Sequence, residues 1–268
     1  MNVRDEKTGL QVQKRTPEED IDIYSEMFSA KTLIEGQDGG VATSLLVWGL
    51  QRGLFDCAVV VHRKQGYRAE AVVAEAVCDI LEAKGTTYLR VNTVSKLKSL
   101  VDSGRRRIAM VGTPCQVQAA RKMQSVLLKK HPYLELTLVG LFCLEAFNYE
   151  RLKGEVRRLL RFDLDAAEKT QIRNGKFTVW VGGKESSVSV KELNAAVEKG
   201  CSLCSDFTAR YADVSVGSVG SDEGYSTVVV RTPVGRILLE NLDLTRGAVR
   251  REEIVRLAAF KKKHAANV

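Results

Sequence analysis

The sequence is poor in aromatic residues and lacks the common phosphate-binding loops. Only 6% of its 268 residues are Phe, Trp or Tyr, and the basic residues are not interleaved with aromatics as a nucleic-acid stacking platform requires. There is no G-x-G-x-x-G dinucleotide loop and no G-x-x-x-x-G-K-S/T phosphate loop. We therefore expect no nucleic-acid partner and no nucleotide site of these two kinds.

Long apolar runs are also absent. No stretch approaches the roughly 20 residues of a membrane-spanning helix. The first twenty residues, MNVRDEKTGLQVQKRTPEED, are polar and of mixed charge, unlike a secretory signal. We therefore expect a cytoplasmic protein without a membrane span.

Histidine is scarce, which limits the kinds of catalytic and metal site. The three histidines, His62, His131 and His264, lie in unrelated contexts. A histidine-rich metal site or a catalytic dyad is not indicated. No catalytic residue is assigned from the sequence.

Charge of both signs is present, with an excess of positive charge. The formal net charge is +8, and the basic residues include RRR at 105–107 and KKK at 261–263. Such runs can attract an anionic cofactor or an acidic partner, but most charge runs are solvated. We expect a solvated surface and a basic tail at residues 261–268.

Alternation of strands and helices predicts an α/β fold. We expect a mainly parallel or mixed sheet flanked by helices, with a small antiparallel addition near residues 176–190 in the C-terminal half. The continuous apolar run at 55–61 predicts a strand covered on both faces. The stretches AEAVVAEAVCDILEAKG, 69–85, and the charged VKELNAAVEKG, 190–200, each predict a helix.

Six cysteines are the most informative residues. In a reducing compartment they favour metal or redox chemistry over a disulfide framework. Cys57 lies in the apolar run and Cys78 in the predicted helix, so both are interpreted as packed core thiols. The other four are Cys115, Cys143, Cys201 and Cys204.

These four cysteines occupy positions suited to a shared site. Thr113 and Pro114 suit the start of a helix, which places Cys115 at the positive end of a helix dipole, where a thiolate is stabilised. Cys143 follows a predicted strand, and Cys201 and Cys204 form a C-x-x-C pair. Four thiolates suit one 4Fe-4S cluster or one structural zinc. A redox dithiol or unrelated thiols are the remaining alternatives.

Two glycine-rich loops accompany the cysteines. GQDGG, 36–40, precedes a predicted helix, and SVGSVGSDEGYST, 215–227, precedes a predicted strand. Their bare backbone N–H groups suit an anion or a planar ring approached closely by the chain. Together with the cysteines they indicate a flat cofactor.

Four segments carry a resemblance to a known family. They are GQDGGVATSLLVWGLQRGLFDCAVVV, VGTPCQVQAARKMQ, GLFCLEAFNYERL and CSLCSDFTARYADVSVGSVGSDEGYSTVVVRT. From about residue 30 to about residue 260 the chain resembles the coenzyme F420 hydrogenase/dehydrogenase beta-subunit family. The resemblance implies an α/β fold that binds FAD and one 4Fe-4S cluster, with coenzyme F420 as substrate.

The resemblance also implies a division of the chain and a set of site residues. Residues 1–30 would be a polar leader, 31–110 an N-terminal α/β region on the flavin side, and 111–260 a C-terminal region with cluster and flavin loops. The four implied cluster ligands are Cys115, Cys143, Cys201 and Cys204. The implied flavin-lining residues are Gln37, Asp38, Gly39, Gly40, Thr43, Gly85, Thr86, Thr87, Tyr88, Gly217, Ser218, Gly220, Tyr225, Ser226 and Thr227.

The implied function is electron transfer between F420, FAD and the cluster, and on to other subunits of a hydrogenase or dehydrogenase complex. Two positions depart from the family pattern: Thr87 stands where members often have lysine, and Tyr225 where many have tryptophan. Two alternatives stay open. One is an FAD/4Fe-4S reductase that uses ferredoxin or another substrate, and the other is a zinc-stabilised binding module without redox activity.

Overall fold

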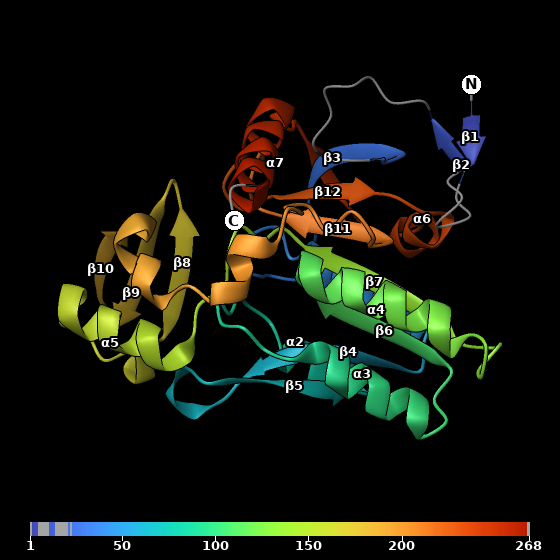
Figure 1. Cartoon of the computed structure of the whole chain (residues 1–268), viewed down its shortest axis with the longest axis horizontal. Helices are drawn as coiled ribbons and strands as arrows, with labels where there is room; N and C mark the ends of the chain where they lie inside the picture. The colour runs from blue at the N-terminus through green and yellow to red at the C-terminus, as the bar shows by residue number, and fades with distance from the viewer. Residues whose placement is uncertain (1, 5–10, 14–20, 22, 267–268) are drawn as a thin grey trace.

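An eight-stranded mixed sheet forms the centre of the protein (Figure 1). The structure is a computed structural model that describes residues 2–4, 11–13, 21 and 23–266. The strand order is β13-β3-β12-β11-β7-β6-β4-β5. The strands are β3 Glu26–Lys31, β4 Cys57–Arg63, β5 Ala69–Ala74, β6 Arg107–Gly112, β7 Glu135–Leu141, β11 Val214–Gly217, β12 Ser226–Val230 and β13 Thr245–Gly247.

The middle of this sheet is parallel and its two sides are antiparallel. β4, β6, β7 and β11 run parallel to one another, whereas β5, β12, β3 and β13 join through antiparallel pairs. The predicted α/β class with a mixed sheet is confirmed. The α-helices of this part are α1 Val41–Gln51, α2 Val77–Glu82, α3 Thr93–Asp102, α4 Pro114–Leu127, α6 Pro233–Leu239 and α7 Arg251–Ala266.

A second, three-stranded antiparallel sheet stands beside the first (Figure 1, left). It consists of β8 Lys169–Arg173, β9 Lys176–Val181 and β10 Lys184–Ser189, and α5 Tyr149–Leu160 packs with it. Phe147 and Phe177 lie edge to face in its separate core, with ring centroids 6.0 Å apart. The predicted antiparallel addition is therefore confirmed. The remaining elements are β1 Asn2–Arg4, β2 Gln11–Gln13, η1 Gln65–Tyr67, η2 Leu164–Ala166, η3 Val190–Ala196 and η4 Lys199–Leu203.

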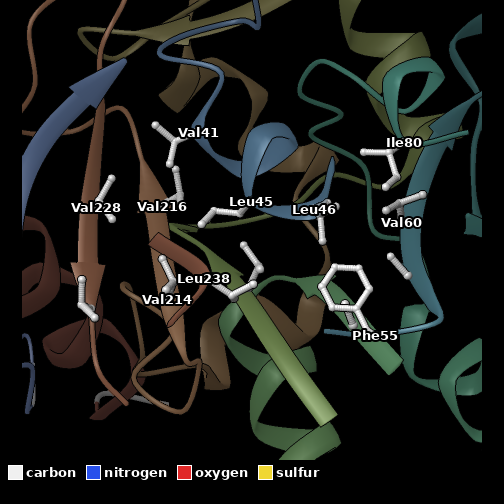
Figure 2. Packing of buried hydrophobic residues seen from close by; sticks show 14 of the residues in the cluster. Val41, Leu45, Leu46, Phe55, Val60, Ile80, Val214, Val216, Val228 and Leu238 are labelled. Atoms are coloured by element: carbon white, nitrogen blue, oxygen red, sulfur yellow. The ribbon is translucent and has the colours of Figure 1, made fainter. Parts of the chain in front are cut away.

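Apolar side chains cover both faces of the large sheet. On one face, Leu45 and Leu46 of α1 pack between the strands and α6, with Leu45 toward Val216 and Leu46 toward Val60 (Figure 2). On the other face, helices α3 and α4 bury Leu97 and further residues of a second cluster. Strands buried on both faces explain the continuous apolar runs in the sequence.

The helix predicted over 69–85 is wrong in its first half. Residues 69–74 form β5, which pairs antiparallel with β4, and only Val77–Glu82 is helical. Alanine-rich sequence favours a helix locally, but pairing along β4 supplies backbone hydrogen bonds and packing that override this preference.

Two smaller sequence expectations also need correction. Cys57 is buried as predicted, but Cys78 is exposed, because the short helix α2 buries Ile80 and leaves Cys78 on its outer side. The segment 190–200, read as a charged helix, forms the 3₁₀ turns η3 and η4.

The basic runs are also partly engaged within the chain. Arg105 and Arg107 form ion pairs with Glu75 and Asp56. The expectation of a solvated tail is wrong for Lys261, which is 5% exposed on α7. No helix in the described part of the chain is both long and apolar enough to cross a bilayer.

The division of the chain at residue 110 falls within β6. Both halves contribute strands to the large sheet, since β3 pairs with β12 and β13. The division stays a prediction about family regions. Expectations for residues 1, 5–10, 14–20, 22 and 267–268 lie outside the described residues.

Asp213 joins the parallel and antiparallel halves of the large sheet. Its carboxylate is buried, accepts the Leu138 backbone N–H at 2.7 Å and pairs with Arg121 of α4 at 2.7 Å. It also accepts the Thr232 hydroxyl at 2.7 Å, at the start of α6. One side chain thus ties β7, α4 and α6 to the strand β11 that follows it.

Replacing this carboxylate should destabilise the fold strongly. We expect Asp213→Ala to lower the free energy of unfolding by about 3 kcal/mol, because the Arg121 guanidinium and the Leu138 N–H lose their buried partner. Urea denaturation followed by circular dichroism measures the change. The matched control is Asp102→Ala, which removes an exposed ion pair with Lys98 and should cost less than about 0.5 kcal/mol. Equal effects of the two substitutions would contradict the role of Asp213.

Candidate functional site

Two of the four cysteines follow neighbouring parallel strands. Cys115 lies after β6 in the first turn of α4, and Cys143 lies after β7, which is paired with β6. The carboxyl ends of such strands are where α/β sheets place their ligand sites. The predicted helix start is confirmed: Thr113 is the N-cap residue, and its N–H donates to Gln116 Oε1 at 2.9 Å.

The backbone holds Cys143 from two sides. Its N–H donates to Phe207 O at 2.9 Å, and its thiol donates to Glu145 O at 3.5 Å. The preceding residue, Phe142, packs on Gly217, where a Cβ would come within 2.3 Å of the ring. Glycine at 217 therefore allows the β11–β12 loop to lie directly against the Cys143 segment.

The C-x-x-C pair lies in and just after the 3₁₀ turn η4. The Ala146 N–H donates to Cys201 Sγ at 3.3 Å, which connects this turn to the segment after Cys143. The Cys204 N–H donates to Cys201 O at 3.3 Å, and its thiol donates to Asp206 O at 3.6 Å. The pair does not open an α-helix after a strand, as a thioredoxin-type dithiol does.

The four thiols share one electrostatic environment. Burial raises the pKa of Cys143 to about 12, the charge of Lys261 opposes this, and the other three thiols raise it further. Burial also raises the pKa of Cys201 and of Cys204, with Cys115 acting on both. The structure therefore gathers the four predicted cysteines in one region. Within the described residues, no three Cys, His, Asp or Glu side chains are arranged to hold a single metal ion.

The three segments predicted to line a flavin come together at a second place. Gln37 donates to the Tyr88 hydroxyl at 3.0 Å and accepts the Thr86 N–H at 3.1 Å. The Gly39 N–H donates to Ser226 Oγ at 3.1 Å. Residues about 50 and 190 positions apart are thus joined through direct hydrogen bonds.

The small sheet closes this place from a third direction. The Ile172 N–H of β8 donates to the Tyr88 hydroxyl at 2.8 Å. Burial raises the pKa of Asp38, and the nearby charges of Arg173 and Lys169 partly oppose the shift. Both cations lie on β8, and neither is among the predicted site residues. No motif marks them, because only the folding of the small sheet brings β8 to Asp38.

The predicted glycines fall into two groups. A Cβ at Gly39 would come within 2.3 Å of Ala30 O, and one at Gly220 within 2.9 Å of Arg250 O. These two glycines, like Gly217, are required by contacts within the chain. A Cβ at Gly85 would meet no atom within 4 Å, so the backbone there is open to an approaching group.

The other predicted residues take less uniform positions. Thr227 is fully buried, and its hydroxyl donates to Val219 O at 2.7 Å across the base of the loop. Tyr225 lies beneath the ammonium of Lys31, 5.1 Å from the ring centroid. Gly40 is the N-cap of α1, Thr43 lies in its first turn, Thr87 precedes Tyr88, and Ser218 follows β11.

Comparison with known proteins identifies two family regions. The profile of the coenzyme F420 hydrogenase/dehydrogenase beta subunit N-terminus matches residues 27–98, and that of its C-terminus matches residues 105–255.

Individual relatives agree with this match. The coenzyme F420 hydrogenase subunit beta of Methanococcus voltae is 35% identical over 213 residues, which are 78% of this chain and 76% of the relative. The coenzyme F420-dependent sulfite reductase of Methanocaldococcus jannaschii is 36% identical over 253 residues, 90% of this chain but 40% of the reductase. This chain thus spans less than half of that protein.

A solved structure has the same fold. A chain from the xenon-derivatised F420-reducing NiFe hydrogenase complex of Methanosarcina barkeri superposes with a TM-score of 0.87 at 30% identity. The superposition covers 95% of this chain and 94% of the other.

The Tyr88 hydroxyl should stabilise the fold in a pH-dependent way. Burial raises the pKa of Tyr88 to about 12, whereas an unfolded tyrosine titrates near 10. Its contribution is therefore complete below about pH 10 and declines as the pH rises from 10 to 12. We expect Tyr88→Phe to cost about 2 kcal/mol at pH 9, because Ile172 and Gln37 lose their acceptor, and about 1 kcal/mol less at pH 11.

Urea unfolding at the two pH values measures this difference. Tyr133, which is 80% exposed, provides the control: Tyr133→Phe should change the free energy of unfolding by less than about 0.5 kcal/mol at either pH. A cost of Tyr88→Phe that is the same at pH 9 and pH 11 would contradict the expectation.

Proposed function

This chain belongs to the coenzyme F420 hydrogenase/dehydrogenase beta-subunit family, and we propose that it is an electron-transfer subunit that oxidises or reduces coenzyme F420 within an oxidoreductase complex. In this proposal the chain holds one FAD and one 4Fe-4S cluster. The observation that supports it is a contact between the two candidate sites: the loop that begins at Gly217 packs on Phe142, next to Cys143.

The four gathered thiols support a cluster. Cys115, Cys143, Cys201 and Cys204 would hold it, since an all-sulfur donor set of four suits iron–sulfur chemistry. The first turn of α4 directs its positive end at Cys115, and the Ala146 N–H already points at Cys201 Sγ. Both features stabilise negative charge on sulfur.

The joined segments support a flavin. Gln37, Thr86, Tyr88 and Ser226 fix the three segments to one another. The open backbone at Gly85 would let a planar ring approach closely. Flavin chemistry supplies hydride exchange with F420 and single-electron exchange with a cluster.

The chain's own residues have a positioning task in this proposal. The hydrogen bonds of Gln37 fix the spacing of the three loops, and the cations Lys169 and Arg173 of β8 lie near Asp38, where they suit an anionic part of a ligand. Packing of Phe142 on Gly217 keeps the two sites adjacent. No side chain needs to act as an acid or base.

The relatives support F420 as the substrate and leave the partner open. The names of the similar proteins join F420 to a hydrogenase in one case and to sulfite reduction in another. The region shared with this chain therefore occurs in proteins named for F420, whereas the second substrate in the names differs between the two relatives.

Cofactor analysis of Cys115→Ala tests the cluster. Anaerobically purified wild-type protein should contain about four iron and four sulfide with one flavin. Cys115→Ala should lose most of the iron, because one of four thiolates is missing, while it retains the flavin at a separate site. Iron, sulfide and flavin assays with a visible spectrum measure this.

The exposed Cys78 gives the control for this substitution. Cys78→Ala should keep wild-type iron and flavin. Stoichiometric zinc without flavin in the wild-type protein would contradict the redox proposal and favour a zinc-stabilised module. A cluster that survives intact in Cys115→Ala would contradict the assignment of this ligand.

Anaerobic mixing with reduced F420 tests the substrate. The visible absorbance of the flavin should bleach as F420 is oxidised, on the order of one F420 per flavin. The matched comparison is reduced ferredoxin. Bleaching by ferredoxin and not by reduced F420 would favour the alternative reductase.

A further inference from the structure

A buried lysine stands on the apolar face of the last helix. Ile254, Ala258 and Lys261 are spaced at i, i+4 and i+7 on α7, which places them on one side of the helix. All three are buried, with Lys261 5% exposed. Its neighbour Lys263 is exposed on the same helix. An apolar residue is expected at position 261 on this buried face, so a buried charge there requires a physical explanation.

The ammonium of Lys261 reaches the segment that follows Cys143. Its Nζ donates a hydrogen bond to the backbone carbonyl of Leu144. Helix α7 also lies against η4, the turn that contains Cys201. One helix therefore contacts two of the three cysteine segments, and its single buried charge lies at their junction.

Burying an ammonium is costly unless other charges compensate it. The Leu144 carbonyl is neutral and accepts a hydrogen bond without balancing the charge. Cys143 and Glu145 flank Leu144 in the chain, and η4 contains Cys201. Side chains that can carry a compensating negative charge therefore lie on both segments that α7 contacts.

We propose that Lys261 is a positioning residue that holds the Cys143 segment against α7 and offsets the negative charge of the four-cysteine centre. The inference rests on the proposed function, because the charge is useful where four thiolates hold a redox centre. A nearby fixed cation stabilises the form that has gained an electron. Lys261 therefore raises the midpoint potential of the cluster.

Removing the charge while keeping a hydrogen-bond donor tests this. In the full chain, the cluster of Lys261→Gln should have a lower midpoint potential than that of wild type. The expected change is about tenfold in the equilibrium constant of one-electron reduction, or about 59 mV. Lys261→Arg keeps the charge and should restore the wild-type potential. Redox titration followed by electron paramagnetic resonance gives the potential, and iron analysis gives the cluster content.

Lys263→Gln is the matched control, because it removes the same charge from an exposed position of the same helix. Its potential should equal that of wild type. If Lys261→Gln fails to fold by circular dichroism, Lys261→Met replaces it, since an apolar side chain suits that face of α7. Loss of the cluster from the folded neutral variant, with retention in Lys261→Arg, also supports the proposal.

Two results separate failure of this inference from failure of the proposed function. An unchanged potential in an iron-loaded, folded neutral variant overturns the role of Lys261 and leaves the proposed function intact. Loss of the cluster from folded Lys261→Arg as well overturns the role of charge in the same way. A wild-type protein that binds zinc in place of iron overturns both.

Discussion

The arrangement of this protein depends on the hydrogen bonds and the ion pair that the buried carboxylate of Asp213 makes. It lies where the parallel and antiparallel halves of the large sheet meet and binds groups from β7, α4 and the start of α6. Its backbone continues the same junction, because its N–H donates to Leu138 O and its carbonyl accepts the Arg231 N–H. Cys143 follows β7, Cys115 lies in the first turn of α4, and β11 ends at Gly217, where the loop begins. The junction therefore fixes the relative position of elements that carry both candidate sites.

Two contacts around the candidate cysteine site, one of them to the loop of the candidate flavin site, involve backbone atoms or small residues. Glycine at 217 lets the Phe142 ring lie against the loop, and the Ala146 N–H reaches Cys201 Sγ. The close packing of Phe142 on Gly217 leaves little freedom for the loop to move relative to the Cys143 segment. Such rigidity suits the proposed transfer of electrons, in which the protein contributes spacing, burial and charge while the cofactors contribute the chemistry.

Family membership limits the function without naming the partner. The relatives include a hydrogenase subunit of similar length and a sulfite reductase of which this chain corresponds to 40%. The same fold is therefore used as a subunit in one protein and as part of a longer chain in another. The departures at Thr87 and Tyr225 lie on segments of the proposed flavin site. The structure adds Lys31 over the Tyr225 ring, so a cation is present on this side although position 87 carries none.

The sequence by itself determined the α/β class, the antiparallel addition and the identity of the family, because apolar periodicity and local motifs are properties of neighbouring residues. The residue types also mark the four cysteines and two glycine-rich loops as candidates, and the family resemblance adds residues 85–88; their roles stay predictions. Tertiary structure decided what depends on distant contacts. Residues 69–74 form a strand because they pair along β4. Arg173 and Lys169 lie near Asp38 because the small sheet folds against this part of the chain. The sequence predicts a basic tail at Lys261, whereas in the fold this residue is buried on α7, which packs against η4, and bonds to Leu144 O next to Cys143.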